Sequence, residues 1–300
     1  MTDLVRELDA LRSGPAFVDR SDRGFVRVTG PDAQSFLQVI VSADLDALAD
    51  GDAVASLLLH PQGKLDVAFR VVKVQADDLW LDTDPGMAPQ LVTSLERFKI
   101  RVDATIEDRS ASWGMLTVLG VGAAPDRDDS CRVVPSAIGA GVDVVGPADV
   151  LGALAERLSA DGVTRVGPAT WEAFRVERGI PVQPFDIDDA TIPQEAELEL
   201  DAVSFTKGCF VGQELVCRID SRGHVNRFLR RLAVVDGDAP AVGAEIVAGD
   251  KVVGAVTSVT PAGVPPRALG YVRREIEPGA TVELRSAAGS AHAQVEPLRP

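Results

Sequence analysis

The sequence predicts an α+β fold that ends in an all-β module. In the first 120 residues, runs with the two-residue alternation of strands are interleaved with runs that place apolar residues on one helical face. After residue 228, short β-type runs are separated by Gly, Pro and Asp turns, which indicates a small barrel or sandwich. The chain has 300 residues, 46% of them hydrophobic, which is more than one core usually holds, so we expect two or three modules.

The first half of the chain alternates predicted strands with predicted helices. Residues 16–29 have the pattern of strands. Pro31 suits the first turn of a helix that continues through SFLQVI at residues 35–40. A second helix is predicted at residues 88–98, because its large apolar residues share one face. Further strands are predicted at residues 53–59, 65–74, 79–82, 101–106 and 115–119, and a loop at the acidic APDRDDS segment, residues 124–130.

The second half predicts two helices, a long loop and the β module. The helices are expected at residues 148–158 and 169–178, and Gly179 is a natural stop for the second. Residues 180–199, which contain three prolines and a run of acids, are expected to form an extended loop, and a loop of that length usually has a function. The runs RRLAVV, AEIVAG, KVVGAVTSV, GYVRR and TVELRS that follow are the predicted strands of the last module.

Composition excludes several classes of protein. The formal charge of −15 disfavours broad attraction to nucleic acid or to an anionic membrane, because neutralising phosphates requires surplus Lys and Arg. No stretch approaches the roughly 18 to 20 consecutive apolar residues of a membrane span, and the first residues lack a signal-peptide core, so we expect a soluble cytoplasmic protein. Three cysteines without a C-x-x-C pair and three scattered histidines argue against disulfides and against an internal metal site.

Charge is distributed unevenly in the second half. Residues 182–201 carry seven acids and no base, whereas residues 202–231 carry six cations and two acids. Two interpretations are open. Either the acidic and basic blocks pair with each other across a surface, or the basic block forms a local pocket for an anion.

The segment KGCFVGQE, residues 207–214, places one cysteine between two glycines and beside a lysine. A nearby cation or a helix N-terminus lowers the pKa of a thiol, so Cys209 is a candidate catalytic residue and Lys207 its partner. QELVCRID, residues 213–220, fits a helix that would add to this effect, but it alternates equally well as a strand. Gly208 and Gly212 permit positive φ and close approach of a ligand, or simply form a turn. A small buried residue in a turn is the alternative for Cys209, and a packed core residue is the expectation for Cys217.

The same segment resembles the K-G-C-[FY]-x-G-Q-E signature of the YgfZ-type folate-binding proteins, relatives of the glycine-cleavage T-protein. All fixed positions match. Other pieces follow in the family's order: FLQ-x-x-x-SAD at residues 36–44, QGK at 62–64, RVERG at 175–179, IPQE at 192–195 and Arg222-Gly223. The resemblance covers about residues 25–231, with a β-rich tail where the family has a barrel.

The resemblance implies a three-module architecture around a central opening, with two α+β modules that are ferredoxin-like in part and a C-terminal antiparallel β-barrel. The modules are expected at residues 1–48 with 142–228, which include the cysteine motif, at 49–141, and at 229–300. The family binds tetrahydrofolate, or a one-carbon derivative, and supports maturation or repair of iron-sulfur enzymes, including a tRNA-modifying one. The expected partners are therefore folate and iron-sulfur client or assembly proteins, with no membrane and no direct nucleic-acid contact.

The resemblance also assigns candidate site residues. Glu177 matches the family glutamate that grips the donor edge of the pterin, although a solvated glutamate paired with Arg175 or Arg178 is the alternative. Asp66 lies near the catalytic aspartate of the T-protein, with the register uncertain by one residue, and Asp44 matches the aspartate of SAD, where a helix-end cap is the alternative. The remaining cofactor-binding candidates are Gly208 and Gln213 of the signature, and Arg218, Arg222 and Arg227 for the carboxylates of the folate tail. Phe205, Phe210 or Trp171 could flank the pterin or belong to a core.

Three functions compete at this point. The first is a folate-dependent accessory protein of iron-sulfur assembly, in which Cys209 reacts, transiently holds iron or sulfur, or only shapes its loop. The second is a folate-dependent aminomethyltransferase or other one-carbon transferase or demethylase. The third is a binding module that has lost both activities, which a folate titration would separate.

Overall fold

A computed structural model describes residues 3–121, 125, 128–287 and 289–299, which divide into two compact units. We call them the barrel unit and the sheet unit. The barrel unit comprises Met1–Leu8, Gly167–Leu198 and Arg218–Pro300, and the sheet unit comprises Asp9–Val166 and Glu199–Cys217. Three of the seven residues of the APDRDDS segment, for which a loop is predicted, lie outside the described residues: Ala124, Asp126 and Arg127.

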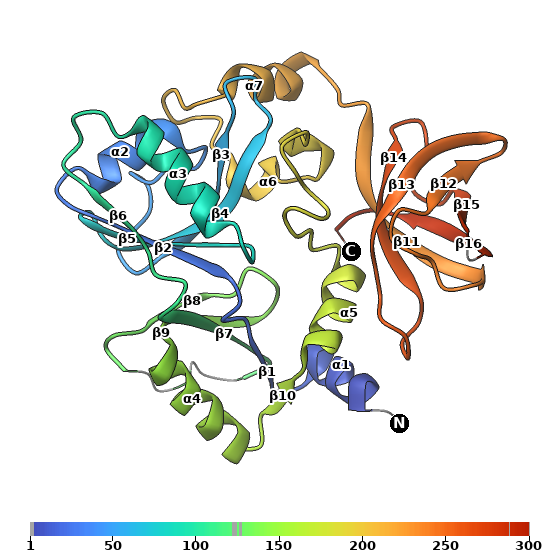
Figure 1. Cartoon of the computed structure of the whole chain (residues 1–300), viewed down its shortest axis with the longest axis horizontal. Coiled ribbons are helices and arrows are strands. Elements are labelled where there is room, and N and C mark those ends of the chain that lie inside the picture. The colour runs from blue at the N-terminus through green and yellow to red at the C-terminus, as the bar shows by residue number, and fades with distance from the viewer. Residues whose placement is uncertain (1–2, 122–124, 126–127, 288, 300) are drawn as a thin grey trace. The chain divides into compact units, whose positions relative to one another are not determined.

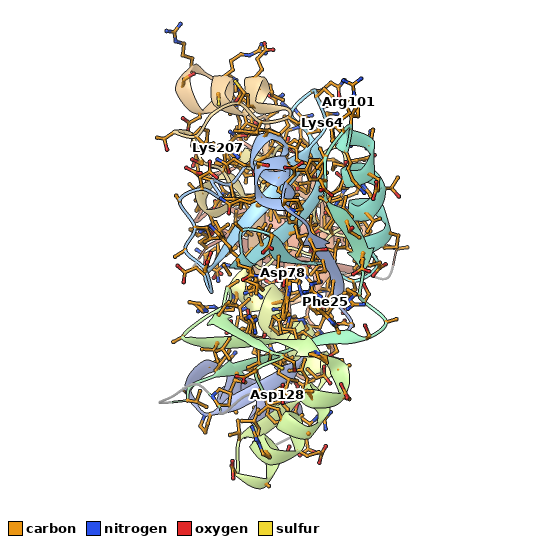
Figure 2. All side chains as sticks on the ribbon, turned by 90° about the vertical axis from the view of Figure 1, so that its left-hand side faces the viewer. Phe25, Lys64, Asp78, Arg101, Asp128 and Lys207 are labelled. Carbon is orange, nitrogen blue, oxygen red and sulfur yellow. The ribbon has the colours of Figure 1, made fainter. Side chains whose placement is uncertain are left out.

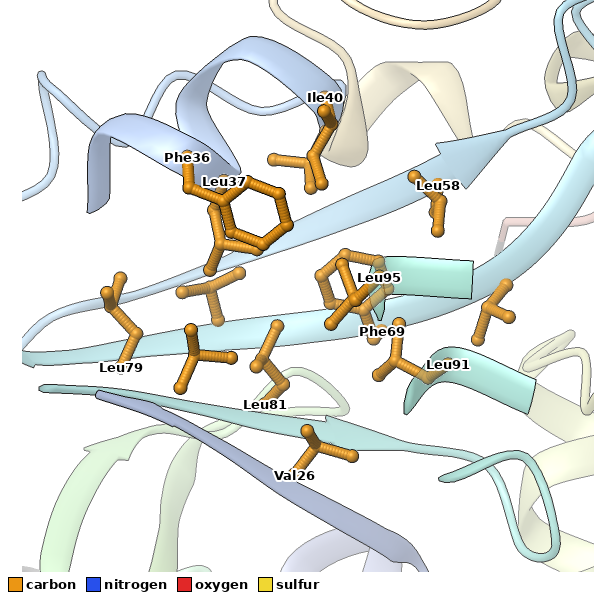
Figure 3. Close-up of a cluster of buried hydrophobic side chains, with 14 of the residues drawn as sticks. Val26, Phe36, Leu37, Ile40, Leu58, Phe69, Leu79, Leu81, Leu91 and Leu95 are labelled. Carbon is orange, nitrogen blue, oxygen red and sulfur yellow. The ribbon is translucent and has the colours of Figure 1, made fainter. Parts of the chain in front are cut away.

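The first sheet of the sheet unit has the strand order β3-β4-β5-β2-β6, and all neighbouring strands are antiparallel. Two helices pack their apolar faces on it: Phe36 and Leu37 come from one helix, and Leu91 and Leu95 from the other (Figure 3). The elements are β2 (Gly24–Thr29), α2 (Ala33–Ile40), β3 (Ala53–Leu59), β4 (Leu65–Gln75), β5 (Asp78–Thr83), α3 (Ala88–Phe98) and β6 (Thr105–Asp108).

The second sheet has the order β10-β1-β7-β9-β8, in which only the β10-β1 pair is parallel among the described strands. Helix α4 buries Leu151, Leu154 and Leu158 in a cluster with residues of this sheet. The elements are β1 (Ala16–Asp19), β7 (Trp113–Leu119), β8 (Arg132–Pro135), β9 (Gly141–Pro147), α4 (Ala148–Ala160) and β10 (Thr164–Val166).

A buried ion pair network joins the two sheets of this unit. Arg70 of β4 donates to Asp82 of β5 at 2.8 Å and to Asp143 of β9 at 2.6 Å. Asp143 also accepts from Thr117 of β7. Between the same two sheets, the rings of Trp80 of β5 and Trp113 of β7 are in tilted contact, with centroids 4.2 Å apart and an interplanar angle of 55°. Because all these charges have partners, they can be buried between the sheets.

The barrel unit contains a closed antiparallel barrel with the strand order β11-β14-β13-β12-β15-β16, drawn in orange and red in Figure 1. Closure leaves no edge strand in this sheet. The strands are β11 (Arg227–Gly237), β12 (Glu245–Ala248), β13 (Lys251–Val259), β14 (Arg267–Arg273), β15 (Thr281–Ser286) and β16 (Gly289–Glu296). The other elements of the chain are α1 (Asp3–Ser13), α5 (Pro168–Arg178), the short 3₁₀ helix η1 (Pro193–Glu195), α6 (Glu199–Ala202) and α7 (Gln213–Arg222).

The predicted elements are largely confirmed. The predicted helix at residues 88–98 matches α3, and Gly179 ends α5 with a φ of 70°. QELVCRID is a helix, so the strand alternative was wrong. The strand predicted at residues 101–106 begins only at Thr105. Arg101 has a φ of 57°, which breaks an extended strand, and the N–H of Asp103 donates to the carboxylate of Asp32 instead of to a strand partner.

The module boundaries remain a prediction. Strand β2, from the range expected for the first module, lies in one sheet with β3 to β6. Strands β7 and β8, from the range expected for the second module, lie in one sheet with β1, β9 and β10. The sheets therefore combine strands from both expected ranges.

Candidate functional site

Cys209 lies on an irregular loop of the sheet unit, residues 203–212, which we call the cysteine loop. The Cys209 side chain is exposed, whereas the next residue, Phe210, is only 6% exposed and anchors the loop. The side-chain oxygen of Gln213, the first residue of α7, accepts the N–H of Phe210 at 3.2 Å. The buried-turn alternative for Cys209 is therefore wrong, because the buried residue of this turn is its neighbour. Cys217, expected in a core, is partly exposed on α7.

Two glycines bring the cysteine loop against the turn between β3 and β4. Gly63 of the QGK turn and Gly212 of the cysteine signature have φ values of 79° and 78°, a region that favours glycine. A Cβ on Gly212 would lie 2.4 Å from the carbonyl oxygen of His60 and 3.2 Å from the Cα of Gly63. A Cβ on Gly63 would lie 2.6 Å from the Cβ of Leu215. These glycines are therefore required by close backbone contact as well as by the turn. Gly208 differs, because a Cβ there would meet nothing within 4 Å.

Lys207, labelled in Figure 2, connects the cysteine loop to the end of α2 through the hydrogen bonds of its ammonium group. Its Nζ donates to the carbonyl oxygens of Gln38, Val41 and Ala43 at 2.6, 2.8 and 2.7 Å. Burial lowers the pKa of Lys207 to about 8, while the nearby carboxylates of Asp44 and Asp46 act in the opposite direction. The ammonium group is thus directed at main-chain oxygens.

The FLQ-x-x-x-SAD segment forms the other side of this contact. The amide of Gln38 donates to Asp44 at 2.9 Å and accepts the N–H of Leu45 at 2.7 Å. The hydrogen bond from Gln38 lowers the pKa of Asp44. The fully buried hydroxyl of Ser42 donates to the carbonyl of Ala202, and the carbonyl of Ser42 accepts the N–H of Ser204. Asp44 thus stabilises the turn after α2 rather than capping the helix itself, since α2 ends four residues earlier.

Asp66 is buried, with 3% of its surface exposed, at the start of β4. Its carboxylate accepts a hydrogen bond from Gln90 of α3 at 2.8 Å and lies 3.7 Å from the guanidinium of Arg97. Both contacts link β4 to α3.

In the barrel unit, Glu177 is partly exposed near the C-terminal end of α5. Its carbonyl oxygen accepts a hydrogen bond from Arg231 of β11 at 3.0 Å. Two residues later, a Cβ on Gly179 would lie 2.0 Å from the carbonyl oxygen of Leu298. The end of α5 is therefore held against the barrel strand and the C-terminal segment.

Arg175, the first residue of RVERG, is buried and hydrogen-bonds to several side chains, which the sequence did not reveal. It is 5% exposed and donates to Glu172, to Asp186 at 2.8 Å and to the hydroxyl of Ser258 at 2.8 Å. Asp186 also accepts from Thr257 of β13. Arg175 therefore joins α5 to the long loop and to the barrel. Its position one helical turn from Glu172 was the available signal, but nothing in the sequence points to Asp186.

The acidic and basic blocks of the sequence meet in part. Arg227 donates to Glu195 of IPQE at 3.0 Å, and Arg230 donates to Glu197 at 3.0 Å. For these residues, the acidic and basic blocks pair with each other. The guanidinium of Arg227 also stacks on the ring of Tyr271, 4.2 Å from its centroid. Burial is the main cause that raises the pKa of Tyr271 to about 12. Arg218 and Arg222 are exposed on α7.

The predicted site residues thus fall into two sets, one in each unit. The sheet unit holds the set around the cysteine loop: Asp44, Asp66, Lys207, Gly208, Cys209 and Gln213. The barrel unit holds the others: Glu177, Arg218, Arg222 and Arg227. Within the sheet unit, the contacts of Lys207 bring the SAD segment and the cysteine signature together, and the contact between Gly63 and Gly212 adds the QGK turn.

Two negative findings apply to the described parts of the chain. No group of three or more His, Cys, Asp or Glu side chains there is placed to hold a metal ion. None of the helices there combines the length and apolar character that a membrane crossing requires.

Comparison with known proteins shows what this chain is similar to. Residues 1–125 match the model of the GCVT N-terminal domain. A YgfZ tRNA-modifying protein of Klebsiella pneumoniae is 28% identical over 75% of this chain and 73% of its own length. An aminomethyltransferase of Prosthecochloris aestuarii is 28% identical over 72% of this chain and 68% of its own. A mitochondrial iron-sulfur cluster assembly factor IBA57 homologue of Mycosarcoma maydis is 28% identical over 68% of this chain and 54% of its own.

The fold has a solved counterpart. The crystal structure of the glycine cleavage system aminomethyltransferase T of Bartonella henselae superimposes with a TM-score of 0.85, at 21% identity, over 98% of this chain and 88% of that one. The predicted α+β class with a C-terminal barrel is therefore confirmed as the T-protein fold. The sequence matches confirm the resemblance: the chain is similar to YgfZ-type proteins and to aminomethyltransferases.

Proposed function

We propose that this chain is a tetrahydrofolate-binding accessory protein that supports the assembly or repair of iron-sulfur enzymes. The observation that carries the proposal is the exposed Cys209 on a loop that three motif segments of the YgfZ-type proteins hold in place. Relatives named as a YgfZ tRNA-modifying protein and as an iron-sulfur cluster assembly factor favour this function over others on the same fold.

The side chains of the barrel unit have the chemistry that a reduced folate requires. A pterin presents a ring N–H beside an exocyclic amine, and a partly exposed carboxylate such as Glu177 accepts both. The folate tail ends in carboxylates, and a guanidinium binds a carboxylate through two parallel hydrogen bonds. Arg222 is exposed and therefore available for this contact, whereas Arg227 is already paired with Glu195. Tetrahydrofolate would supply a one-carbon carrier, and Glu177 and Arg222 would orient it.

Folate binding is tested by titrating the protein with tetrahydrofolate and following both the melting temperature and the heat of binding. Glu177→Gln keeps the size of the side chain but removes the charged acceptor, so we expect the Kd to rise at least about tenfold, which corresponds to about 1.4 kcal/mol. Glu275→Gln, an exposed change on the barrel unit, is the control and should leave the Kd unchanged. Absence of any folate affinity would indicate a module that has lost this function.

The role of the thiol is tested in cells. In a strain that lacks the gene, a plasmid with Cys209→Ala should fail to restore the activity of an iron-sulfur enzyme under oxidative stress, whereas Cys217→Ala should restore it. Full rescue by Cys209→Ala would remove the thiol from the function. A tRNA-modifying enzyme is a suitable client to assay, and the charge of −15 favours an effect through that client over direct contact with tRNA in the cytoplasm.

A folate-dependent aminomethyltransferase is the second candidate, favoured by the relative that bears this name. Asp66 lies near the position of the catalytic aspartate, but its carboxylate contacts Gln90 and Arg97 of α3. Incubation with an aminomethyl-lipoyl carrier and tetrahydrofolate distinguishes the two candidates. Formation of methylene-tetrahydrofolate would favour the transferase.

A further inference from the structure

The direction of the Lys207 ammonium group bears on the role of this residue in the cysteine signature. In the sequence, Lys207 stands two residues before the thiol and is a candidate for activating it. A lysine ammonium has three N–H donors. In the structure, Nζ donates to three carbonyl oxygens, at distances of 2.6 to 2.8 Å. All three donors are therefore used on the main chain, and none remains for a thiolate or a substrate.

One of the three acceptors is a carbonyl of α2 that lacks a helical partner, and the other two, those of Val41 and Ala43, belong to the turn that follows α2. The last carbonyls of an α-helix have no intrahelical donor and carry partial negative charge. The carbonyl of Gln38 is one of these, because the N–H of Ser42, which would reach it in a longer helix, donates to Leu57 instead. A cation from another segment satisfies such groups well. Lys207 supplies that cation to the end of α2.

The contact fixes the cysteine loop at several points. The N–H of Lys207 donates to the hydroxyl of Ser204 at 3.2 Å, and the N–H of Ser204 donates to Ser42 at 2.9 Å. The ammonium group also lies 5.8 Å from the centroid of the Phe210 ring. Phe210 is the buried neighbour of Cys209. Lys207 thus lies between the fixed end of α2 and the residue that anchors the thiol.

We propose that Lys207 is a positioning residue that pins the cysteine loop to the end of α2, and not a catalytic partner of the thiol. This inference does not depend on folate binding. It implies that FLQ-x-x-x-SAD and the cysteine signature form one structural device, in which the first segment supplies the acceptors and the second the donor.

The pin is tested by amide hydrogen exchange of the full chain. In Lys207→Met, we expect exchange at least about tenfold faster than in the wild-type protein in peptides covering both residues 36–46 and residues 203–212. Lys207→Arg should give an intermediate rate, because it keeps the charge but its planar fork does not converge on three acceptors as an ammonium does. Lys64→Met, an exposed lysine on the neighbouring turn, is the control and should change neither segment. Unchanged exchange in both segments, or faster exchange in only one of them, would overturn the proposal.

A second measurement separates positioning from activation of the thiol. The alkylation rate of Cys209 by iodoacetamide is followed against pH, with tandem mass spectrometry to distinguish Cys209 from Cys217. For a positioning residue, the pH of half-maximal rate is the same in the wild-type protein, Lys207→Arg and Lys207→Met. A shift of that midpoint upward by one pH unit or more in Lys207→Met would make Lys207 an electrostatic partner of the thiolate and would contradict the proposal.

Two controls keep the result interpretable. Circular dichroism establishes that each variant is folded, and Lys207→Arg provides the comparison if Lys207→Met is not. Neither measurement uses folate, so a failed folate titration would refute the proposed function and leave the pin standing, while unchanged exchange would refute the pin alone.

Discussion

The cysteine loop, which carries Cys209, and the end of α5, which carries Glu177, are held in place by different contacts. The cysteine loop is held mainly through the main chain: Lys207 donates to three carbonyls, and Gly212 packs against the backbone of the β3-β4 turn. The end of α5 also has main-chain contacts, at Glu177 and Gly179. What the cysteine loop lacks, and α5 has, is a buried ion pair network in which Arg175 pairs with Glu172 and Asp186.

The difference predicts how each region responds to mutation. A complete buried ion pair contributes little net stability, but removing one partner leaves an uncompensated buried charge and costs about 3 to 5 kcal/mol. A contact between backbones responds to added atoms and to φ instead, with costs of about 1 to 3 kcal/mol. Charge deletion should therefore affect the α5 region most, and addition of a methyl group should affect the cysteine loop most.

The largest effect is expected for Arg175→Met. The side chain of Asp186 is 0% exposed and would lose its cation, so we expect the free energy of unfolding to fall by about 3 to 5 kcal/mol. Urea unfolding measures this change. Arg178→Met, an exposed change on the same helix, should alter the value by less than about 0.5 kcal/mol. A loss below about 1 kcal/mol in Arg175→Met would show that charge does not hold this region.

A smaller effect is expected for Gly212→Ala. The added Cβ would lie 2.4 Å from the carbonyl oxygen of His60, at a φ of 78°, so we expect a loss of about 1 to 3 kcal/mol in unfolding free energy. Gly208→Ala is the matched control within the same motif, because its Cβ would meet nothing within 4 Å. Thermal unfolding compares the two. Equal melting temperatures would contradict the close contact between the loop and the turn.

The smallest effect concerns how the contribution of Lys207 to stability depends on pH. The pKa of Lys207 is about 8 in the folded protein, below its ordinary value of 10.5, so between these values the unfolded chain binds more protons than the folded one. Stability of the wild-type protein relative to Lys207→Met should therefore rise as the pH increases from 8 to 10.5. Because the side chain is only half-buried, solvent screening limits the change to less than about 1 kcal/mol. Denaturant titrations across this range measure the change. If the stability of the wild-type protein relative to Lys207→Met falls as the pH rises, the prediction is wrong.

Local patterns predicted most of the fold, because they reflect local physics. The apolar face of residues 88–98 and the glycine at 179 were sufficient to place α3 and the end of α5. QELVCRID was ambiguous, since its buried residue, Val216, fits either periodicity. In the structure it is a helix that follows the turn at Gly212, and that turn lies against His60 and Gly63, which are distant in sequence.

The candidate site was predictable as a set of residues but not as a set of roles. The motifs pointed to Cys209 and Lys207, yet which atoms accept from Lys207 depends on where α2 ends in space. The contact of Arg175 with Asp186 depends on the path of the long loop, which sequence periodicity does not specify. The charged residues of a motif therefore indicate where a site lies more directly than they indicate which contacts their side chains make.

Tyr271 offers an intrinsic optical reporter, because it is the only tyrosine of the chain. Its phenol lies under the guanidinium of Arg227, which in turn is paired with Glu195 of the IPQE motif. The ultraviolet absorbance of tyrosinate at alkaline pH therefore comes from one known position. Any ligand or client that draws Arg227 away from this ring would change that signal, without a label and without a mutation.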